Sequence, residues 1–244
     1  MNDANANNPD GNVIFSGTKE VAENLKFDQS RLQEWLGDSL PSAGKIIDVA
    51  QFKGGQSNPT YKIITEQKEL VLRRKPPGIL LPSAHAVDRE YKVMTALKDT
   101  AVPVPQTYGL CEDEDVIGTS FFVMDFLDGD IYWDLLLEDK SLEERKAIYK
   151  SKNQVIAELH KVDYTAVGLG DYGKPGNYIA RQVSRWTKQY LASETETILA
   201  MNNLIDWLPA NIPDEDETSI VHGDYRLDNM VFGKDNRVMG VLDW

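Results

Sequence analysis

The chain has 244 residues, 41% hydrophobic and 27% charged, so it is long enough to bury a core in one large domain or two small ones. Its 39 acidic and 26 basic side chains give a net charge of −13, which argues against general binding to nucleic acids or anionic membranes. No apolar stretch approaches the roughly 20 residues of a membrane-spanning helix. The single cysteine, Cys111, excludes an internal disulfide and a thiolate cluster for zinc, so a reducing compartment is predicted, with the cytoplasm as the default.

The N-terminal half of the sequence alternates short β-branched runs with two helices. Residues 1–26 are expected to form a flexible tail, followed by an amphipathic helix over 28–40 that Asp28 caps. Strands are predicted at 46–52, 60–65 and 69–74. After a proline-rich break, Ser83 is predicted to cap a second helix that ends near residue 98. Strands at 107–111 and 120–126 would complete a small antiparallel sheet.

After Gly129 the predicted elements become long and helical, and a domain boundary is expected there. The N-terminal lobe would span 27–128 and the second lobe 129–244. A capping box from Ser141 to Glu144 opens the first long helix, and two more are predicted at about 177–193 and 195–208. Two β-like runs, 230–233 and 237–243, would form a hairpin at the end of the chain.

The segment 222–229, with sequence His-Gly-Asp-Tyr-Arg-Leu-Asp-Asn, concentrates side chains that suit phosphoryl transfer. Asp224 could orient an attacking hydroxyl and accept its proton, while Asn229 and Asp243 offer oxygen ligands for Mg²⁺. The alternative is that these residues only build a turn before a hairpin. His222 is expected to hold the loop through hydrogen bonds, because the three histidines lack the spacing of a zinc site.

Glu90 lies on the apolar face of the second predicted helix, where an unpaired carboxylate would be costly. Arg73, on the third predicted strand, is the first candidate for its partner, and Arg74 or Lys75 could take that place instead. The alternative is that Glu90 reaches solvent from the edge of the apolar face.

Together these motifs resemble the aminoglycoside phosphotransferase and choline kinase-like branch of the protein kinase-like superfamily. Residues 222–229 match its catalytic loop and residues 242–244 its second metal-binding motif. Residues 52–61 resemble its phosphate-covering loop, although Gly-Gly alone usually indicates a hairpin turn, and Arg73 stands where the family usually has lysine. The resemblance implies an α+β, protein kinase-like fold of two lobes that transfers a phosphoryl group from ATP with Mg²⁺. It implies catalytic roles for Asp224, Arg73 and Glu90, nucleotide contacts from Gly54, Gly55, Ser57, Asn58, Arg73, Met124, Asp125 and Leu127, and Mg²⁺ binding by Asn229 and Asp243.

The runs 72–91, 102–105 and 116–119 resemble more closely the kinase-like domain of acyl-CoA dehydrogenase family members ten and eleven and their bacterial relatives. This resemblance implies a hydroxyl acceptor, with a hydroxyacyl-CoA such as 4-hydroxyacyl-CoA favoured. Such relatives continue with further helices, so we expect the second lobe of this chain to be incomplete, to expose apolar surface and to be inactive or unstable alone.

Three basic residues, Arg181, Arg185 and Lys188, share one face of a predicted helix and could contact the phosphates of coenzyme A. The alternative is a solvated basic face, which is the more common meaning of such a pattern. Two other functions stay open: a pseudokinase or regulatory nucleotide-binding module, because of Arg73, and a kinase for aminoglycosides or small alcohols, because of the acidic balance. The expected partner is a small molecule, and no motif indicates an oligomeric state or a fused dehydrogenase domain.

Overall fold

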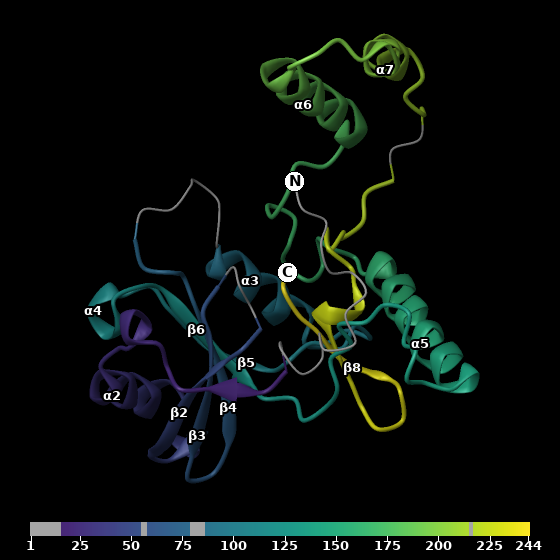
Figure 1. The fold of residues 1–244 in the computed structure, drawn as a ribbon. Helices are drawn as coiled ribbons and strands as arrows, with labels where there is room; N and C mark the ends of the chain where they lie inside the picture. Colours follow the sequence, from purple (N-terminus) through teal and green to yellow (C-terminus); the bar gives the residue numbers. More distant parts are fainter. Residues whose placement is uncertain (1–15, 55–57, 79–85, 215–216) are drawn as a thin grey trace. The chain divides into compact units, whose positions relative to one another are not determined.

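The computed structural model describes residues 16–54, 58–78, 86–214 and 217–244 (Figure 1). The chain divides into two compact units, the first formed by Met1–Val162 with Val221–Trp244 and the second by Asp163–Ile220. The first unit contains residues from both predicted lobes, and the lobe boundary near residue 128 stays a prediction. The second unit, Asp163–Ile220, is called the helical unit.

The first unit is built on a six-stranded antiparallel sheet with the strand order β1-β2-β3-β4-β6-β5 (Figure 1). Five of its strands occur where short β-rich runs in the sequence predicted them, within one residue at each end. The strands are β1 (Thr18–Lys19), β2 (Ile46–Phe52), β3 (Thr60–Thr65), β4 (Glu69–Arg74), β5 (Thr107–Cys111) and β6 (Phe121–Asp125). The expectation of a flexible tail over 1–26 is wrong for β1, because Thr18 pairs with Phe52. A strand of two residues is too short for its period to be seen in a sequence.

The two faces of the sheet pack against different helices. Helices α2 (Gln29–Ser39) and α4 (Glu114–Ile117) cover one face, and α3 (Val87–Leu97) packs on the other. Because side chains alternate along a strand, Leu70 and Leu72 of β4 point toward α2, whereas Val71 points toward α3. Arg73 therefore lies on the α3 face and Arg74 on the opposite face.

The capping residues predicted at the starts of three helices can be compared with those in the structure. Asp28 caps α2 by accepting hydrogen bonds from two backbone N–H groups. Ser141 and Glu144 form the predicted capping box of α5 (Leu142–Lys161). The expected cap at Ser83 is wrong, because α3 begins at Val87 after Ala86, which has no capping side chain. Ser83 itself lies outside the described residues.

A hairpin of β7 (Met230–Phe232) and β8 (Val238–Val241) follows the short 3-10 helix η3 (Leu227–Asn229) and packs against α5. The segment after β6 runs close along this hairpin, because Asp130 and Phe232 exchange two backbone hydrogen bonds of 2.8 Å. The approach requires glycine at position 129, where a Cβ atom would lie 2.5 Å from the carbonyl oxygen of Phe232. The hairpin and the end of β6 are thereby held together.

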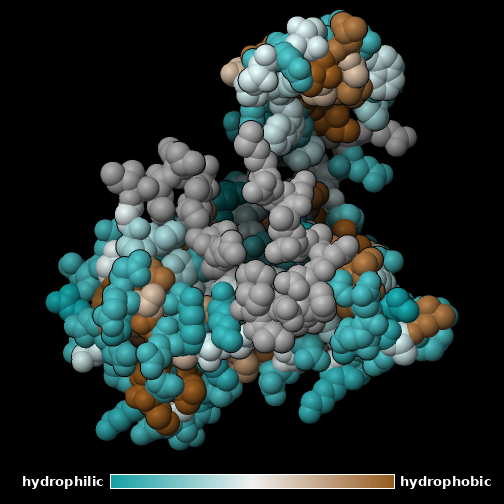
Figure 2. Space-filling view, in the orientation of Figure 1, coloured by the Kyte–Doolittle hydropathy of each residue, from teal (hydrophilic) through white to brown (hydrophobic). Residues whose placement is uncertain are grey.

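The helical unit contains α6 (Tyr178–Ser193) and α7 (Leu199–Ala210), which contact each other. Neither helix contains a buried residue, and Figure 2 shows hydrophobic side chains on the outside of this pair. Trp186, Leu199 and Trp207 are more than half exposed. Among the described residues, no helix has the combination of length and apolar character needed to cross a membrane.

Candidate active site

A cavity of about 520 Å³ opens in the first unit between the α3 face of the sheet, the segment after β6 and the β7–β8 hairpin. Its apolar wall includes Phe52, Val71, Met124, Leu127 and Leu242, and its polar lining includes Arg73, Glu90, Asn229 and Asp243. Residues about 170 positions apart in the sequence thus line one space, and eight of the predicted site residues are among them. Asp224 is not part of this lining, although it contacts Asn229, which is.

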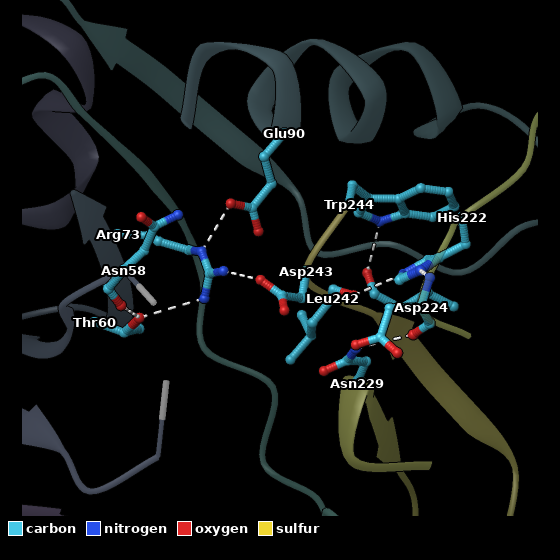
Figure 3. A network of polar contacts seen from close by, with 11 residues as sticks. Asn58, Thr60, Arg73, Glu90, His222, Asp224, Asn229, Leu242, Asp243 and Trp244 are labelled. Carbon is cyan, nitrogen blue, oxygen red and sulfur yellow. Dashed lines mark hydrogen bonds and ion pairs between the residues drawn. The ribbon is translucent and has the colours of Figure 1, made fainter. Parts of the chain in front are cut away.

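Arg73 joins two carboxylates at the wall of this cavity (Figure 3). Its Nε atom donates a hydrogen bond of 2.7 Å to Oε2 of Glu90, and its Nη2 atom pairs with Oδ1 of Asp243. Glu90 is 3% exposed, whereas the side chain of Asp243 is 44% exposed. The planar guanidinium therefore links the buried interior of the sheet face with the open end of the hairpin.

The electrostatics of this trio follow from burial. Burial raises the pKa of Glu90 to about 7, although the positive charge of Arg73 acts in the opposite direction. Burial also acts to lower the pKa of Arg73, but Glu90 and Asp243 outweigh it and raise that pKa. Arg73 is consequently a permanent positive charge at the cavity wall.

Arg74 and Lys75, the alternative partners of Glu90, point elsewhere. Arg74 lies on the α2 face, where its Nε atom donates a hydrogen bond of 3.0 Å to Oγ1 of Thr119. The Nζ atom of Lys75 lies 3.8 Å from Oδ1 of Asp88. Strand alternation thus selects Arg73 as the ion-pair partner of Glu90.

Asp243 has an unusual backbone conformation, with φ of +62° in the left-handed region. Its neighbours fix that conformation, because the N–H of Leu242 donates to the carbonyl oxygen of Asn229 at 2.9 Å. The indole N–H of Trp244 donates to the carbonyl oxygen of Val241 at 3.0 Å. Strained backbone of this kind persists where the surroundings determine it, and it often occurs at functional sites.

His222 connects the loop of Asp224 with the strand end before Asp243. Its Nε2 atom lies 2.8 Å from the carbonyl oxygen of Leu242, and its Nδ1 atom accepts a hydrogen bond of 3.3 Å from the backbone N–H of Asp224. A carbonyl can only accept, so Nε2 carries the proton and the ring is neutral. Burial lowers the pKa of His222, which favours this neutral form. The geometry agrees with a holding role for His222.

The carboxylate of Asp224 is 56% exposed and is contacted from two sides. Nδ2 of Asn229 donates to its Oδ2 atom at 3.1 Å and to the backbone oxygen of Asp224 at 2.9 Å. Nε of Arg226 lies 3.3 Å from its Oδ1 atom. Residue types and spacing in the sequence predict no role for Arg226, and its position two residues after Asp224 is the one signal for this contact.

The side chains proposed to hold Mg²⁺ present the chemistry that this ion requires. The amide nitrogen of Asn229 is engaged by Asp224, which leaves its amide oxygen as a potential ligand. Asp243 supplies a half-exposed carboxylate, and both residues line the cavity. Hard oxygen donors are the ligands that Mg²⁺ prefers, so the donor set fits.

The segment that follows β6 lines the cavity and carries backbone N–H groups that the strand pairing leaves unused, among them that of Leu127. The N–H of Asp125 donates to Gln106 at 2.9 Å and the N–H of Phe126 to Glu69 at 3.3 Å. In the part of the chain that the structure describes, the N–H of Leu127 donates to no protein acceptor. Met124, Asp125 and Leu127, the predicted adenine contacts, all line the cavity.

The predicted phosphate-covering loop is only partly described. Gly54 lines the cavity, whereas Gly55 and Ser57 lie outside the described residues. Asn58 is 6% exposed, and its carbonyl oxygen accepts a hydrogen bond of 3.0 Å from the hydroxyl of Thr60. That hydroxyl also lies 3.5 Å from Nη1 of Arg73, so the end of this loop adjoins the ion-pair network (Figure 3).

The predicted substrate residues lie on α6 in the helical unit. Arg181, Arg185 and Lys188 border a shallow depression on the exposed face of this helix. Both terminal nitrogens of Arg181 are engaged by backbone oxygens of the preceding loop, those of Lys174 and Gly176. Arg181 therefore serves the local structure, and Arg185 and Lys188 are the better candidates for contacting an anion.

Comparison with known proteins decides the family. The profile of a family described as the phosphotransferase enzyme family, APH, matches residues 48–244, which is most of the chain. The chain belongs to this family. The matched region contains the whole Arg73, Glu90, Asp224, Asn229 and Asp243 constellation, so the phosphotransferase family assignment covers the site just described.

Several relatives of this family member carry acyl-CoA dehydrogenase names. The chain is 46% identical over 230 residues to acyl-CoA dehydrogenase family member 10 of Mus musculus, covering 93% of this chain and 21% of that protein. It is also 46% identical over 236 residues to a protein of Arabidopsis thaliana described as probable acyl-CoA dehydrogenase IBR3, covering 90% of this chain and 29% of that protein. The chain thus spans less than a third of the length of these two relatives.

Solved structures confirm the α+β, kinase-like phosphotransferase fold. A crystal structure from Ralstonia eutropha, provisionally named as an aminoglycoside phosphotransferase, is 53% identical with a TM-score of 0.81 and covers 90% of this chain and 65% of that one. A thermostable mutant of aminoglycoside phosphotransferase APH(4)-Ia, in complex with AMP-PNP and hygromycin B, has a TM-score of 0.61. It is 16% identical, with 87% of this chain and 70% of that chain covered, and it supports the fold alone.

Proposed function

We propose that the protein transfers the γ-phosphoryl group of ATP to a hydroxyl group of a small molecule. The observation that carries the proposal is one cavity that Arg73, Glu90, Asn229 and Asp243 line together. The amide nitrogen of Asn229 in turn donates a hydrogen bond to the carboxylate of Asp224. Phosphoryl transfer depends mainly on positioning and on compensation of negative charge. These side chains would supply the positioning, and Arg73 together with bound Mg²⁺ would supply the positive charge.

In the proposed reaction, Asp224 orients the acceptor hydroxyl and accepts its proton. Its carboxylate suits this task because it is more than half exposed, and Nδ2 of Asn229 donates a hydrogen bond to it. Arg73, held by Glu90, presents a permanent positive charge toward the phosphates of the nucleotide. Gly54 and its loop would cover those phosphates.

Asn229 and Asp243 would hold Mg²⁺, which when bound neutralises phosphate charge. The hydrogen bonds around Leu242 and His222 hold these two ligands near each other before any ion binds. At the other end of the cavity, the free N–H of Leu127 would donate to the adenine ring, and Met124 would form part of the wall behind it.

The favoured acceptor is a hydroxyacyl-CoA, such as 4-hydroxyacyl-CoA. Support comes from the names of the relatives, which place this type of chain in proteins described as acyl-CoA dehydrogenases. The exposed Arg185 and Lys188 on α6 could contact the phosphates of coenzyme A, and they could equally form a solvated basic face. Charge reversal by Arg185→Glu is expected to weaken acyl-CoA binding and leave ATP binding unchanged.

The deciding experiment measures ATP turnover by the full-length protein against hydroxyacyl-CoAs, choline and aminoglycosides. The panel includes aminoglycosides because of the name given to the Ralstonia eutropha structure. Turnover with one acceptor class and its loss in Asp224→Asn, with nucleotide affinity retained, is the expected result. Normal turnover by Asp224→Asn would refute the mechanism.

A second candidate function is nucleotide binding without transfer, and Arg73 favours it. An arginine stands where the family usually has lysine, and it is bound to Asp243, one of the proposed metal ligands. Binding of ATP with Mg²⁺ but no transfer to any member of the panel would establish this alternative.

A further inference from the structure

The loop that carries Asp224 contains a second ion-pair network, which the mechanism above does not explain. Nε of Arg226 lies 3.3 Å from Oδ1 of Asp224, and Nη2 of the same guanidinium pairs with Oδ2 of Asp228. The side chain of Arg226 is 54% exposed and that of Asp228 only 10%. Arg226 thus connects the exposed carboxylate of Asp224 with a carboxylate that is largely buried.

We propose that Arg226 is a positioning residue for phosphoryl transfer, which holds the carboxylate of Asp224 in the orientation that receives the acceptor proton, and that Asp228 anchors Arg226. This inference rests on the proposed function, because it assigns a role in the same reaction. It adds Arg226 and Asp228 to the site, and neither residue is needed there to react with the acceptor or to bind the metal.

The contacts of Asp224 explain why such a residue is needed. An exposed carboxylate rotates freely about its last side-chain bond unless both oxygens are held. Asn229 holds Oδ2 at 3.1 Å and Arg226 holds Oδ1 at 3.3 Å, so rotation would break both contacts. Exposed ion pairs contribute little to stability, so the effect of Arg226 should appear in orientation and rate.

Asp228 shows the features of an anchor. One of its oxygens pairs with Arg226, while the other, Oδ1, is buried and has no hydrogen-bond partner among the described residues. A buried polar atom without a partner is unfavourable and calls for a reason. Holding Arg226 supplies that reason, since an exposed arginine without a buried anchor would adopt many conformations.

The two contacts require the shape of a guanidinium. Arg226 reaches Asp224 through Nε and Asp228 through Nη2, which are different corners of one rigid plane. The single ammonium group of a lysine could approach one carboxylate but would not hold both in this geometry. Arg226→Lys is therefore expected to recover only part of the activity that Arg226→Gln loses.

The test measures kcat and KM of the full-length protein with the acceptor that the wild type uses, for Arg226→Gln, Asp228→Asn and the double variant. Arg226→Gln should lower kcat about 10- to 100-fold and leave the KM for ATP within about twofold. Asp228→Asn should lower kcat as well, and the double variant should be no slower than Arg226→Gln, because Asp228 acts through Arg226.

Arg237→Gln is a matched control, since Arg237 also pairs with an aspartate two positions away, Asp235, at 3.6 Å on an exposed turn. It should leave kcat unchanged. Thermal unfolding of Arg226→Gln should match that of the wild type, which separates positioning from a structural role.

Each other outcome overturns the inference. An unchanged kcat in Arg226→Gln, or a double variant whose loss equals the product of the single losses, would show that the two residues do not act as one unit. A rise in the KM for ATP that accounts for the whole loss of kcat/KM would instead indicate that Arg226 binds the nucleotide. If the wild type transfers no phosphoryl group, both the proposed function and this inference are wrong. If the wild type is active, Asp224→Asn is inactive and Arg226→Gln has normal activity, this inference alone is wrong.

Discussion

Among single residues, Arg73 and Glu90 form the most buried charged pair of the site. Arg73 is 9% exposed and Glu90 3% exposed, and removal of one member of such a pair leaves the other charge without compensation. The pair therefore fixes a cation at the cavity wall and also bears on the stability of the sheet face.

We expect Arg73→Met to destabilise the protein by about 3 to 5 kcal/mol near pH 8. The loss should be smaller near pH 5.5. Burial already raises the pKa of Glu90 to about 7, and without Arg73 the folded protein would hold this proton to still higher pH. A carboxyl group with a raised folded-state pKa favours the folded state at low pH, and that advantage is lost as pH rises.

Urea unfolding at the two pH values checks this prediction. The double variant Arg73→Met with Glu90→Gln is the control, because it removes the buried charge, and it should recover part of the stability at pH 8. Equal destabilisation by Arg73→Met at both pH values would contradict the assigned electrostatics.

His222 should make stability depend on pH in the opposite direction. Burial lowers its pKa in the folded protein, so the stabilisation is complete above the ordinary histidine value of about 6.5 and is lost as pH falls through the lower folded-state pKa. In His222→Gln, which does not titrate, the fall in stability between pH 7.5 and 5.5 should be smaller than in the wild type. Equal slopes in urea unfolding would exclude the neutral ring deduced from its two hydrogen bonds.

Much of the site could be predicted from residue types and spacing, since the loop 222–229 and Asp243 have separate signals in the sequence. The choice between Arg73 and Arg74 could not be made with certainty, because it depends on which face of β4 meets α3. The clamp of Arg226 and Asp228 depends on side-chain orientations within one loop, and no period or spacing rule expresses these.

At the level of secondary structure elements, the strands were easier to predict than the starts of helices. Strands β2, β3, β4 and β5 have the predicted bounds, because each is a short run rich in β-forming residues that polar or turn-forming residues bound on both sides. Helix α3 begins after Ala86, which makes no side-chain cap, so its start carries no local signal. Tertiary packing of its buried face determines where this helix begins.

The close approach of the segment after β6 to β7 gives a prediction at this level. Gly129→Ala should destabilise the protein by about 1 to 3 kcal/mol, because the added methyl group would lie 2.5 Å from the carbonyl oxygen of Phe232. It should also weaken nucleotide binding, since Leu127 lies two residues away. Unfolding and ATP titration together would measure both effects.

Gly37→Ala provides the matched control for this substitution. Gly37 is exposed within α2, and an added Cβ atom there would have nothing within 4 Å. The same chemical change should therefore stabilise the protein by about 0.5 to 1 kcal/mol through helix propensity. A similar loss of stability in both variants would show that the contact at position 129 is not the cause.

For the whole molecule, the division into two units predicts unequal local stability. Helix α5 in the first unit buries Ile148, Val155 and Leu159, whereas α6 and α7 of the helical unit bury no residue. Local opening requires little free energy where few apolar contacts are lost. Hydrogen exchange should therefore be faster in α6 and α7 than in α5.

Exchange measured by mass spectrometry on peptides from the three helices tests this expectation. Proline at position 209 lies inside α7, so peptides from α6 give the cleaner comparison with α5. Equal protection of α5 and α6 would mean that the apolar side chains of the helical unit, Trp186 among them, are covered in solution.

The adjacent arginines of β4 have a consequence for folding. If β4 paired with β3 one residue out of alignment, every side chain would turn to the other face and Arg74 would be presented to Glu90. Glu90 would still meet a guanidinium, so the ion pair cannot distinguish the correct alignment from this error. The choice falls to the apolar residues, because Leu70 and Leu72 would leave their core and Val71 would replace them. The correct alignment of this strand thus depends on its apolar residues and not on its charged ones.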